Sequence, residues 1–210
     1  MSKATRIFSR IVTVLLALTV LPNLYFNALI YFRIDPGVGE TLWGDELSIS
    51  MFGPGGLYNG LLDTIKSGSG GSLQSFLPLL RPAIIAGILL ALAALTLVAI
   101  AVIAAVSNKK IPILALCAVG VAFVIGAYAS FGNFAEAVTD PSFSIINLLG
   151  EGFLVSLIGS FLQPEVLMLR LVGAVSMTLV IFGAVAVWTG AFLLTTPKSE
   201  KPVKKEKKRP

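Results

Sequence analysis

The chain has 210 residues, of which 56 % are hydrophobic and 13 % are charged, and its formal net charge at pH 7 is +5. Because soluble domains carry about 25 % charged residues, this composition excludes a soluble fold and predicts a multi-pass integral membrane protein. The chain has no histidine, which is the commonest general base and metal ligand, and the single Cys117 excludes an intramolecular disulfide. We therefore expect no enzyme activity, no cofactor and no metal site.

The first ten residues are basic, and the apolar stretch at 11–32 is predicted to be the first transmembrane helix. A cleaved signal peptide is the alternative, but the apolar character continues too far and no small-x-small cleavage site ends it. Pro22 predicts a kink, because it lacks a backbone N–H. Asn23 and Asn27 are four residues apart and share one helix face. They form either a polar site at the kink or hydrogen bonds between helices.

The longest polar segment, 33–81, is predicted to be a small folded cap on the outer side of the membrane. ELSISMF at 46–52 alternates apolar and polar side chains, as a half-buried strand does, and a GPGG turn follows it. LYNGLLDTIK at 57–66 has leucines at helical spacing, and SGSGGS at 67–72 is typical of a flexible link. Three large aromatic residues of the cap are candidates for binding a protein partner: Trp43, Phe52 and Tyr58.

The uncharged stretch at 82–106 is apolar on every face of a helix, which indicates a second span. The short basic turn at 107–110 predicts that a third span, at 111–130, is its antiparallel neighbour. Small residues recur at every fourth position in both spans, which allows close packing of two helices in a membrane. These residues are Ala83, Gly87 and Ala91 in the second span, and Ala118, Ala122, Gly126 and Ser130 in the third.

The region 131–167 is predicted to be a second outer loop. Its apolar stretch at 143–162 is interrupted by Glu151 and glycines, so we expect a re-entrant or interfacial segment rather than a further span. If the segment enters the bilayer, Glu151 is the candidate for an ionisable intramembrane group. The fourth span is predicted at 168–194, and a basic, proline-containing tail follows at 195–210.

The distribution of charge predicts the orientation in the membrane. Three basic residues lie in 1–10, two in 107–110 and seven in the tail, which makes twelve of the sixteen. Because basic segments remain in the cytoplasm, both termini are predicted to be cytoplasmic, in the cell membrane. This segregation also explains the net positive charge without a nucleic-acid partner. The tail is suited to contact anionic lipid, and Lys207 and Lys208 also match a retrieval signal of the endoplasmic reticulum.

Leu42-Trp43 before a strand, and LPLLR at 77–81 before the second span, are similar to the first loop of the claudin and PMP22-like tetraspan group. The plan also resembles that group: cytoplasmic termini, a long first outer loop with strand character, a tight basic inner turn, a shorter second outer loop and a basic tail. The chain lacks the cysteine pair that follows the tryptophan in that group, and the complete W…GLW pattern is missing.

We therefore predict an all-α membrane protein, a bundle of four transmembrane helices with a small outer cap of short strand and helix elements. Its expected role is that of a structural, adhesive or accessory subunit, without enzyme activity, that lies in the lipid bilayer and presents residues 33–81 to a protein partner. A small transporter or channel component is the alternative, and it would use the face with Asn23 and Asn27 together with the Glu151 segment.

Overall fold

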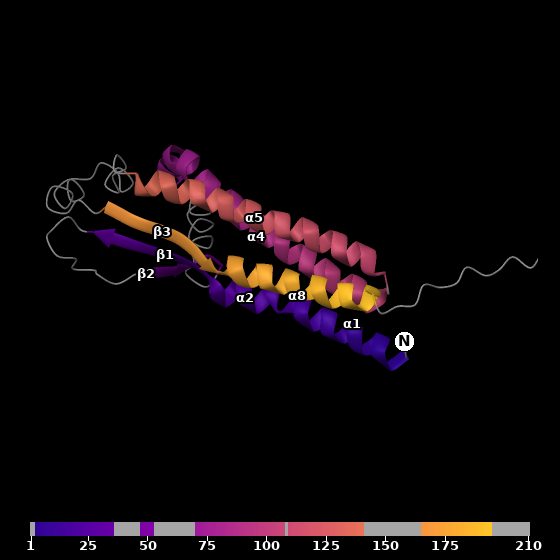
Figure 1. The fold of residues 1–210 in the computed structure, drawn as a ribbon. Helices are drawn as coiled ribbons and strands as arrows, with labels where there is room; N and C mark the ends of the chain where they lie inside the picture. The colour runs from indigo at the N-terminus through magenta and orange to yellow at the C-terminus, as the bar shows by residue number, and fades with distance from the viewer. Residues whose placement is uncertain (1–2, 36–46, 53–69, 108, 141–164, 195–210) are drawn as a thin grey trace, which may run out of the picture.

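The computed structural model describes residues 3–35, 47–52, 70–107, 109–140 and 165–194. Within these ranges, four helices are long and apolar enough to cross a membrane, as predicted: Ala4–Phe26, Leu80–Val106, Lys110–Thr139 and Ala174–Phe192. The helices lie side by side in one bundle, and a small three-stranded sheet extends from one end of it (Figure 1). Four such helices agree with a multi-pass integral membrane protein.

The first span consists of two helices, α1 (Lys3–Leu18) and α2 (Val20–Asn27), with an interruption at Thr19. Pro22 causes this interruption, because it has no N–H to donate to the carbonyl of Leu18, one turn earlier. The sequence predicted a disruption by this proline. What the structure adds is its position, one turn before the proline rather than at it.

The helical part of the first span ends at Asn27, earlier than predicted. Residues 28–32 were expected in the first span, but they belong to strand β1 (Ala28–Asp35). The stretch Leu29–Phe32 consists of leucine, isoleucine and two aromatic residues, and such residues suit a half-buried strand once partner strands are available. Apolar periodicity alone does not separate a buried strand from a helix over so few residues, which explains the difference.

Strand β1 is the central strand of an antiparallel sheet with the order β2-β1-β3. Strand β2 (Leu47–Ser50) lies within the strand predicted at 46–52. Strand β3 (Glu165–Gly173) was not predicted: residues 165–167 were assigned to the second outer loop and 168–173 to the fourth span. The fold is therefore not purely α-helical, and its sheet combines strands from both sides of the second and third spans.

Helix α8 (Ala174–Leu194) begins directly after β3. At the junction, Gly173 has a φ of 83°, a backbone conformation that residues with a side chain rarely adopt. The fourth helix therefore begins at Ala174 rather than at 168, because the chain changes from strand to helix at this glycine.

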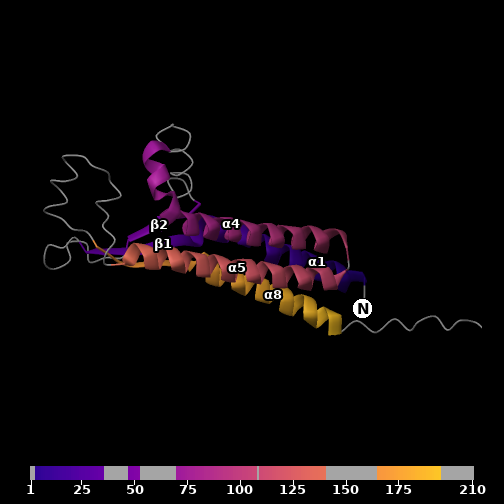
Figure 2. The same ribbon diagram turned by 90° about the horizontal axis from the view of Figure 1, so that it is seen from above.

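Helices α4 (Gly70–Val106) and α5 (Lys110–Thr139) are antiparallel neighbours joined by a short turn, as predicted. Ser130 Oγ donates a hydrogen bond to the carbonyl of Pro82 over 2.9 Å, which links the two helices. Helix α4 begins inside the predicted flexible link at 67–72, and its first turns bend away from the rest of the helix (Figure 2). Pro78 and Pro82 lie in this region, and proline is a common cause of such a bend.

Helix α5 continues to Thr139, beyond the predicted end of the third span at 130. Residues 131–139 were assigned to a loop. This stretch contains no proline, and Pro141 lies just beyond it, so no proline ends the helix before Thr139. Its last turns lie alongside β3 and connect the bundle with the sheet (Figure 1).

The predicted stripes of small residues are only partly at the helix contact. Ala83 and Gly87 are buried and Gly126 contacts Leu89, but three of the small residues are exposed: Ala91, Ala118 and Ala122. The closest approach involves Gly120 instead, where a Cβ atom would overlap the ring of Phe182 on α8. The buried face of α5 therefore runs through Gly120, Val124 and Ala127 rather than along the predicted stripe, because α5 packs against α8 as well as against α4.

The helices form a closed ring in which α1 contacts α4, α4 contacts α5, α5 contacts α8 and α8 contacts α1. One hydrophobic core runs from this ring into the sheet, where Met51, Ile30 and Leu171 belong to it. The outer surface of the ring also carries large apolar side chains, such as Leu95, Val180 and Val187. Such a surface suits contact with lipid tails rather than with water.

Candidate functional site: the outer face of the sheet

The two faces of the sheet differ in character. Ile30 and Leu171 lie directly opposite each other on β1 and β3, and each is only 5 % exposed. Because side chains alternate between the faces of a strand, the neighbouring residues Tyr31 and Arg170 lie on the other face, away from the core. Tyr31 is half-buried and Arg170 is exposed. We call this second face the outer face of the sheet.

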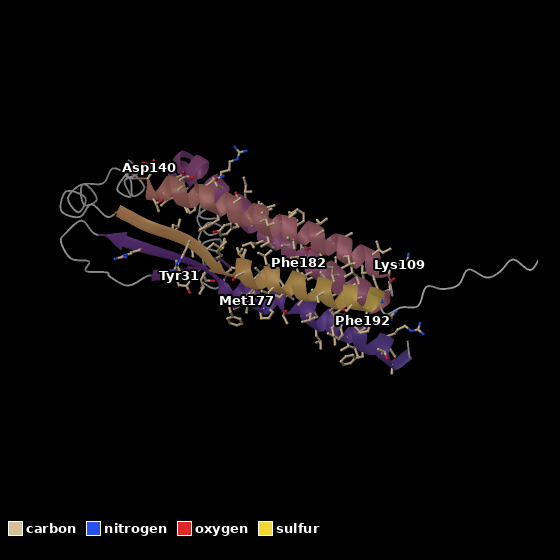
Figure 3. All side chains as sticks on the ribbon, in the orientation of Figure 1. Tyr31, Lys109, Asp140, Met177, Phe182 and Phe192 are labelled. Atoms are coloured by element: carbon tan, nitrogen blue, oxygen red, sulfur yellow. The ribbon has the colours of Figure 1, made fainter. Side chains whose placement is uncertain are left out.

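Tyr31 and Arg170 are also directly paired across the two strands. The guanidinium carbon of Arg170 lies 5.8 Å from the centre of the Tyr31 ring, which is a cation–π distance. Arg33, two residues further along β1, is exposed and pairs with Met168, so it is a diagonal neighbour of Arg170. The outer face thus combines one aromatic ring with two guanidinium groups (Figure 3 shows the position of Tyr31).

The sheet is attached to the bundle without intervening loops. Strand β1 follows α2 directly, and α8 follows β3 directly. Beside these junctions, Asn23 Nδ2 donates hydrogen bonds to Thr178 Oγ1 over 3.1 Å and to the carbonyl of Ala174 over 3.4 Å. These bonds connect α2 to α8 close to the point where each helix meets its strand. The arrangement keeps β1 and β3 in a defined position on the helices.

This contact also shows the role of Asn23, one of the three predicted intramembrane polar residues. Asn23 is buried and bonds across two helices, which is the packing alternative considered for it. Asn27 is the last residue of α2, and its side chain is not described. Glu151 lies outside the described residues. The structure therefore brings Asn23 into contact with α8, and it does not bring the three predicted polar residues together.

Of the three aromatic residues predicted to bind a partner, the structure describes only Phe52. Phe52 follows β2 closely, is partly buried and packs against the hydrophobic core. Trp43 and Tyr58 lie outside the described residues.

Tyr31, Arg33 and Arg170 were not predicted as a site from the sequence, because all three were placed at the ends of spans. Arg170 between Leu169 and Leu171 gives only a short alternation, because 166–169 is continuously apolar, so the stretch is equally compatible with the start of a span.

Among the described residues, no group of three or more Cys, Asp or Glu side chains lies close enough together to hold a metal ion. In comparisons with known proteins, no family model matches the chain, and neither the curated proteins nor the solved structures include a significant match. The role of the outer face must therefore be inferred from its own chemistry.

Proposed function

We propose that this protein is a four-span structural, adhesive or accessory subunit that binds a protein partner through the end that carries the sheet. The outer face of the sheet is the observation that supports this proposal most directly. Tyrosine and arginine are among the residues most enriched at binding hot spots, and here they lie side by side on a framework joined directly to the bundle.

The chemistry of the outer face indicates the kind of partner. The guanidinium groups of Arg33 and Arg170 favour acidic side chains, and the Tyr31 ring against Arg170 adds an aromatic surface beside them. A partner with carboxylates around an apolar centre fits this surface best. The cap at 33–81, with Trp43, Phe52 and Tyr58, extends the proposed interface.

We further propose that the sheet lies outside the cell membrane and that both termini lie in the cytoplasm. The opposite end of the bundle carries Lys109 together with Arg6, Arg10 and Lys110, which share one cavity wall there, and these basic residues support this orientation. The endoplasmic reticulum is the alternative compartment.

A photo-crosslinking residue in place of Tyr31 tests the proposal in intact cells. We expect a discrete protein adduct that is lost when Arg33→Glu and Arg170→Glu are added, because reversed charges repel an acidic partner. Arg81→Glu is the matched control, since Arg81 is exposed on α4 outside the sheet. A crosslinker in place of Leu95 reports contacts of the apolar surface of the bundle.

Two outcomes would contradict partner binding through the outer face. One is the absence of any protein adduct from position 31 while the variant is inserted and as stable as the wild type. The other is an adduct that survives reversal of both sheet arginines, or that Arg81→Glu removes equally well.

A further inference from the structure

A cavity with a volume of about 210 Å³ lies at the end of the bundle opposite to the sheet. All four helical segments of the ring contribute to its wall: Arg6 and Arg10 from α1, Ser107 after α4, Lys110 from α5 and Thr189 from α8. Figure 3 shows this end of the bundle, where Lys109 and Phe192 are labelled. Its volume is far above the ~10–15 Å³ that a single water molecule needs, so it can hold a polyatomic group.

The cavity is strongly positive. Three basic side chains line it, from Arg6, Arg10 and Lys110, and none of the described residues in its wall is acidic. The long helix α5 also begins here, at Lys110, and its N-cap residue makes no side-chain capping hydrogen bond. The helix dipole favours an anion here, whereas the Lys109 N–H already donates to Ser107 Oγ over 3.1 Å and Pro112 in the first turn has no N–H.

A buried hydroxyl in the wall provides the second, independent observation. Thr189 is only 4 % exposed, and its Oγ1 has no hydrogen-bond partner in the described part of the chain. The neighbouring Thr13 differs, because its hydroxyl donates to the carbonyl of Ser9 over 2.9 Å. Buried polar groups normally have a partner, so the Thr189 hydroxyl indicates that the cavity receives a ligand with a hydrogen-bond acceptor.

We propose that this cavity binds a phosphate group, supplied by the headgroup of an anionic phospholipid. Arginine side chains match the geometry of phosphate oxygens, and the Thr189 hydroxyl can donate a further hydrogen bond. The site depends only on the basic end of the bundle and not on the proposed partner-binding face.

The surroundings of the cavity favour a lipid over a soluble phosphate. Trp188 lies next to it, with its ring centre 6.3 Å from that of Phe8 and 5.0 Å from that of Phe192. Such aromatic clusters are typical of the membrane interface, where headgroups are found. Phe8 is 58 % exposed on the outside of α1 and can contact acyl chains while the headgroup enters the cavity.

Thermal unfolding of the full chain in detergent tests the proposal with three added ligands: phosphatidic acid, diacylglycerol with the same acyl chains, and inorganic phosphate. We expect saturable stabilisation by phosphatidic acid and none by diacylglycerol, because the two differ only in the phosphate. Inorganic phosphate should stabilise only at far higher concentration. Equal stabilisation by inorganic phosphate at the same concentration would overturn the lipid as the source. The absence of any stabilisation by phosphatidic acid would overturn the site.

Variants assign the effect to the cavity. The double variant Arg10→Gln/Lys110→Gln should lower the affinity for phosphatidic acid at least tenfold. Lys109→Gln should change this affinity less than twofold. Lys109 is the matched control, because it is an exposed cation in the same turn and is not part of the cavity wall. Equal losses of affinity in Lys109→Gln and in the Arg10→Gln/Lys110→Gln double variant would show a diffuse charge effect and overturn the proposal.

Thr189→Val keeps the test decisive if the cationic variants fold poorly. Valine has the shape of threonine without the hydroxyl, so the protein without lipid should be at least as stable as the wild type. The affinity for phosphatidic acid should fall severalfold. A loss of stability without lipid, together with unchanged lipid affinity, would mean that the hydroxyl has a purely structural role and would overturn the proposal.

Discussion

At the scale of single residues, the tightest helix contact is between Gly120 and Phe182. Phe182 is fully buried, and its ring occupies the space in which a Cβ atom at position 120 would lie. Thr96 Oγ1 approaches the same point to 2.8 Å, so α4, α5 and α8 meet here. A glycine is required at this position because no side chain fits between the three helices.

Gly120→Ala should therefore destabilise the protein by about 1–3 kcal/mol, the usual cost of overpacking a filled core. Thermal unfolding in detergent measures the effect. Gly183→Ala is the matched control, because nothing lies within 4 Å of a Cβ atom there. It should leave stability unchanged or raise it slightly, since alanine is the better helix former. Equal behaviour of the two variants would refute the contact.

The hydrogen bond from Asn23 on α2 to Thr178 on α8 links two helices inside the bundle. A double-mutant cycle with Asn23→Ala and Thr178→Val should give a favourable coupling energy of about 0.6–1.7 kcal/mol, as expected for a polar bond between membrane helices. The cycle requires reversible unfolding of all four proteins in detergent. No coupling would mean that the 3.1 Å contact contributes nothing to packing. A solute flux in liposomes that depends on Asn23 would favour the transporter alternative.

At the scale of elements, two helices continue directly into strands. Helix α2 leads into β1, β3 leads into α8, and the two strands pair along most of their length. The outer face of the sheet therefore depends on one register, in which Tyr31 lies opposite Arg170. A shift by one residue would bring the opposite face of a strand outward.

A pair of cysteines tests this register in a Cys117→Ser background. Tyr31→Cys with Arg170→Cys should form an intramolecular disulfide on mild oxidation, because directly opposite residues have Cα atoms about 4.5–5.5 Å apart. Arg33→Cys with Arg170→Cys is the control, since diagonal neighbours lie about 7–8 Å apart and should stay reduced. Protection of thiols from a maleimide reagent is the measurement. More efficient oxidation of the diagonal pair would show a different register.

At the scale of the whole molecule, the two ends of the bundle have different chemistry. One end carries the sheet with Tyr31, and the other carries the α4–α5 turn, the cavity and the basic residues of α1 (Figure 3). The proposals for partner and phosphate binding therefore concern opposite ends, and the orientation in the membrane decides which compartment each end faces.

Single cysteines in a Cys117→Ser background test that orientation. Arg33→Cys should react with an impermeant maleimide added to intact cells, whereas Lys109→Cys should react only after permeabilisation, because basic turns remain in the cytoplasm. Both positions are exposed in the structure, so accessibility to the reagent is comparable. Labelling of Lys109→Cys in intact cells would reverse the proposed orientation.

The sequence by itself determined the four apolar helices and the pairing of the second with the third. A span depends on the length and composition of one continuous stretch, and a turn of a few residues leaves adjacent helices no other arrangement. The strand at 46–52 was also predictable, because its alternation is a local pattern. Asn23 was recognised as a polar residue in a span, although its partner on α8 was not.

Only the tertiary structure decided the remaining features. Residues 28–35 become a strand because β3, more than a hundred positions away, supplies its hydrogen-bond partners. Gly120 became the critical small residue because α8 as well as α4 packs against α5. The cavity proposed to bind phosphate is lined by Arg10, Lys110 and Thr189. These residues are distant in the sequence and meet only when the four helices close into a ring. Local patterns specify elements, whereas sites between elements depend on how those elements pack.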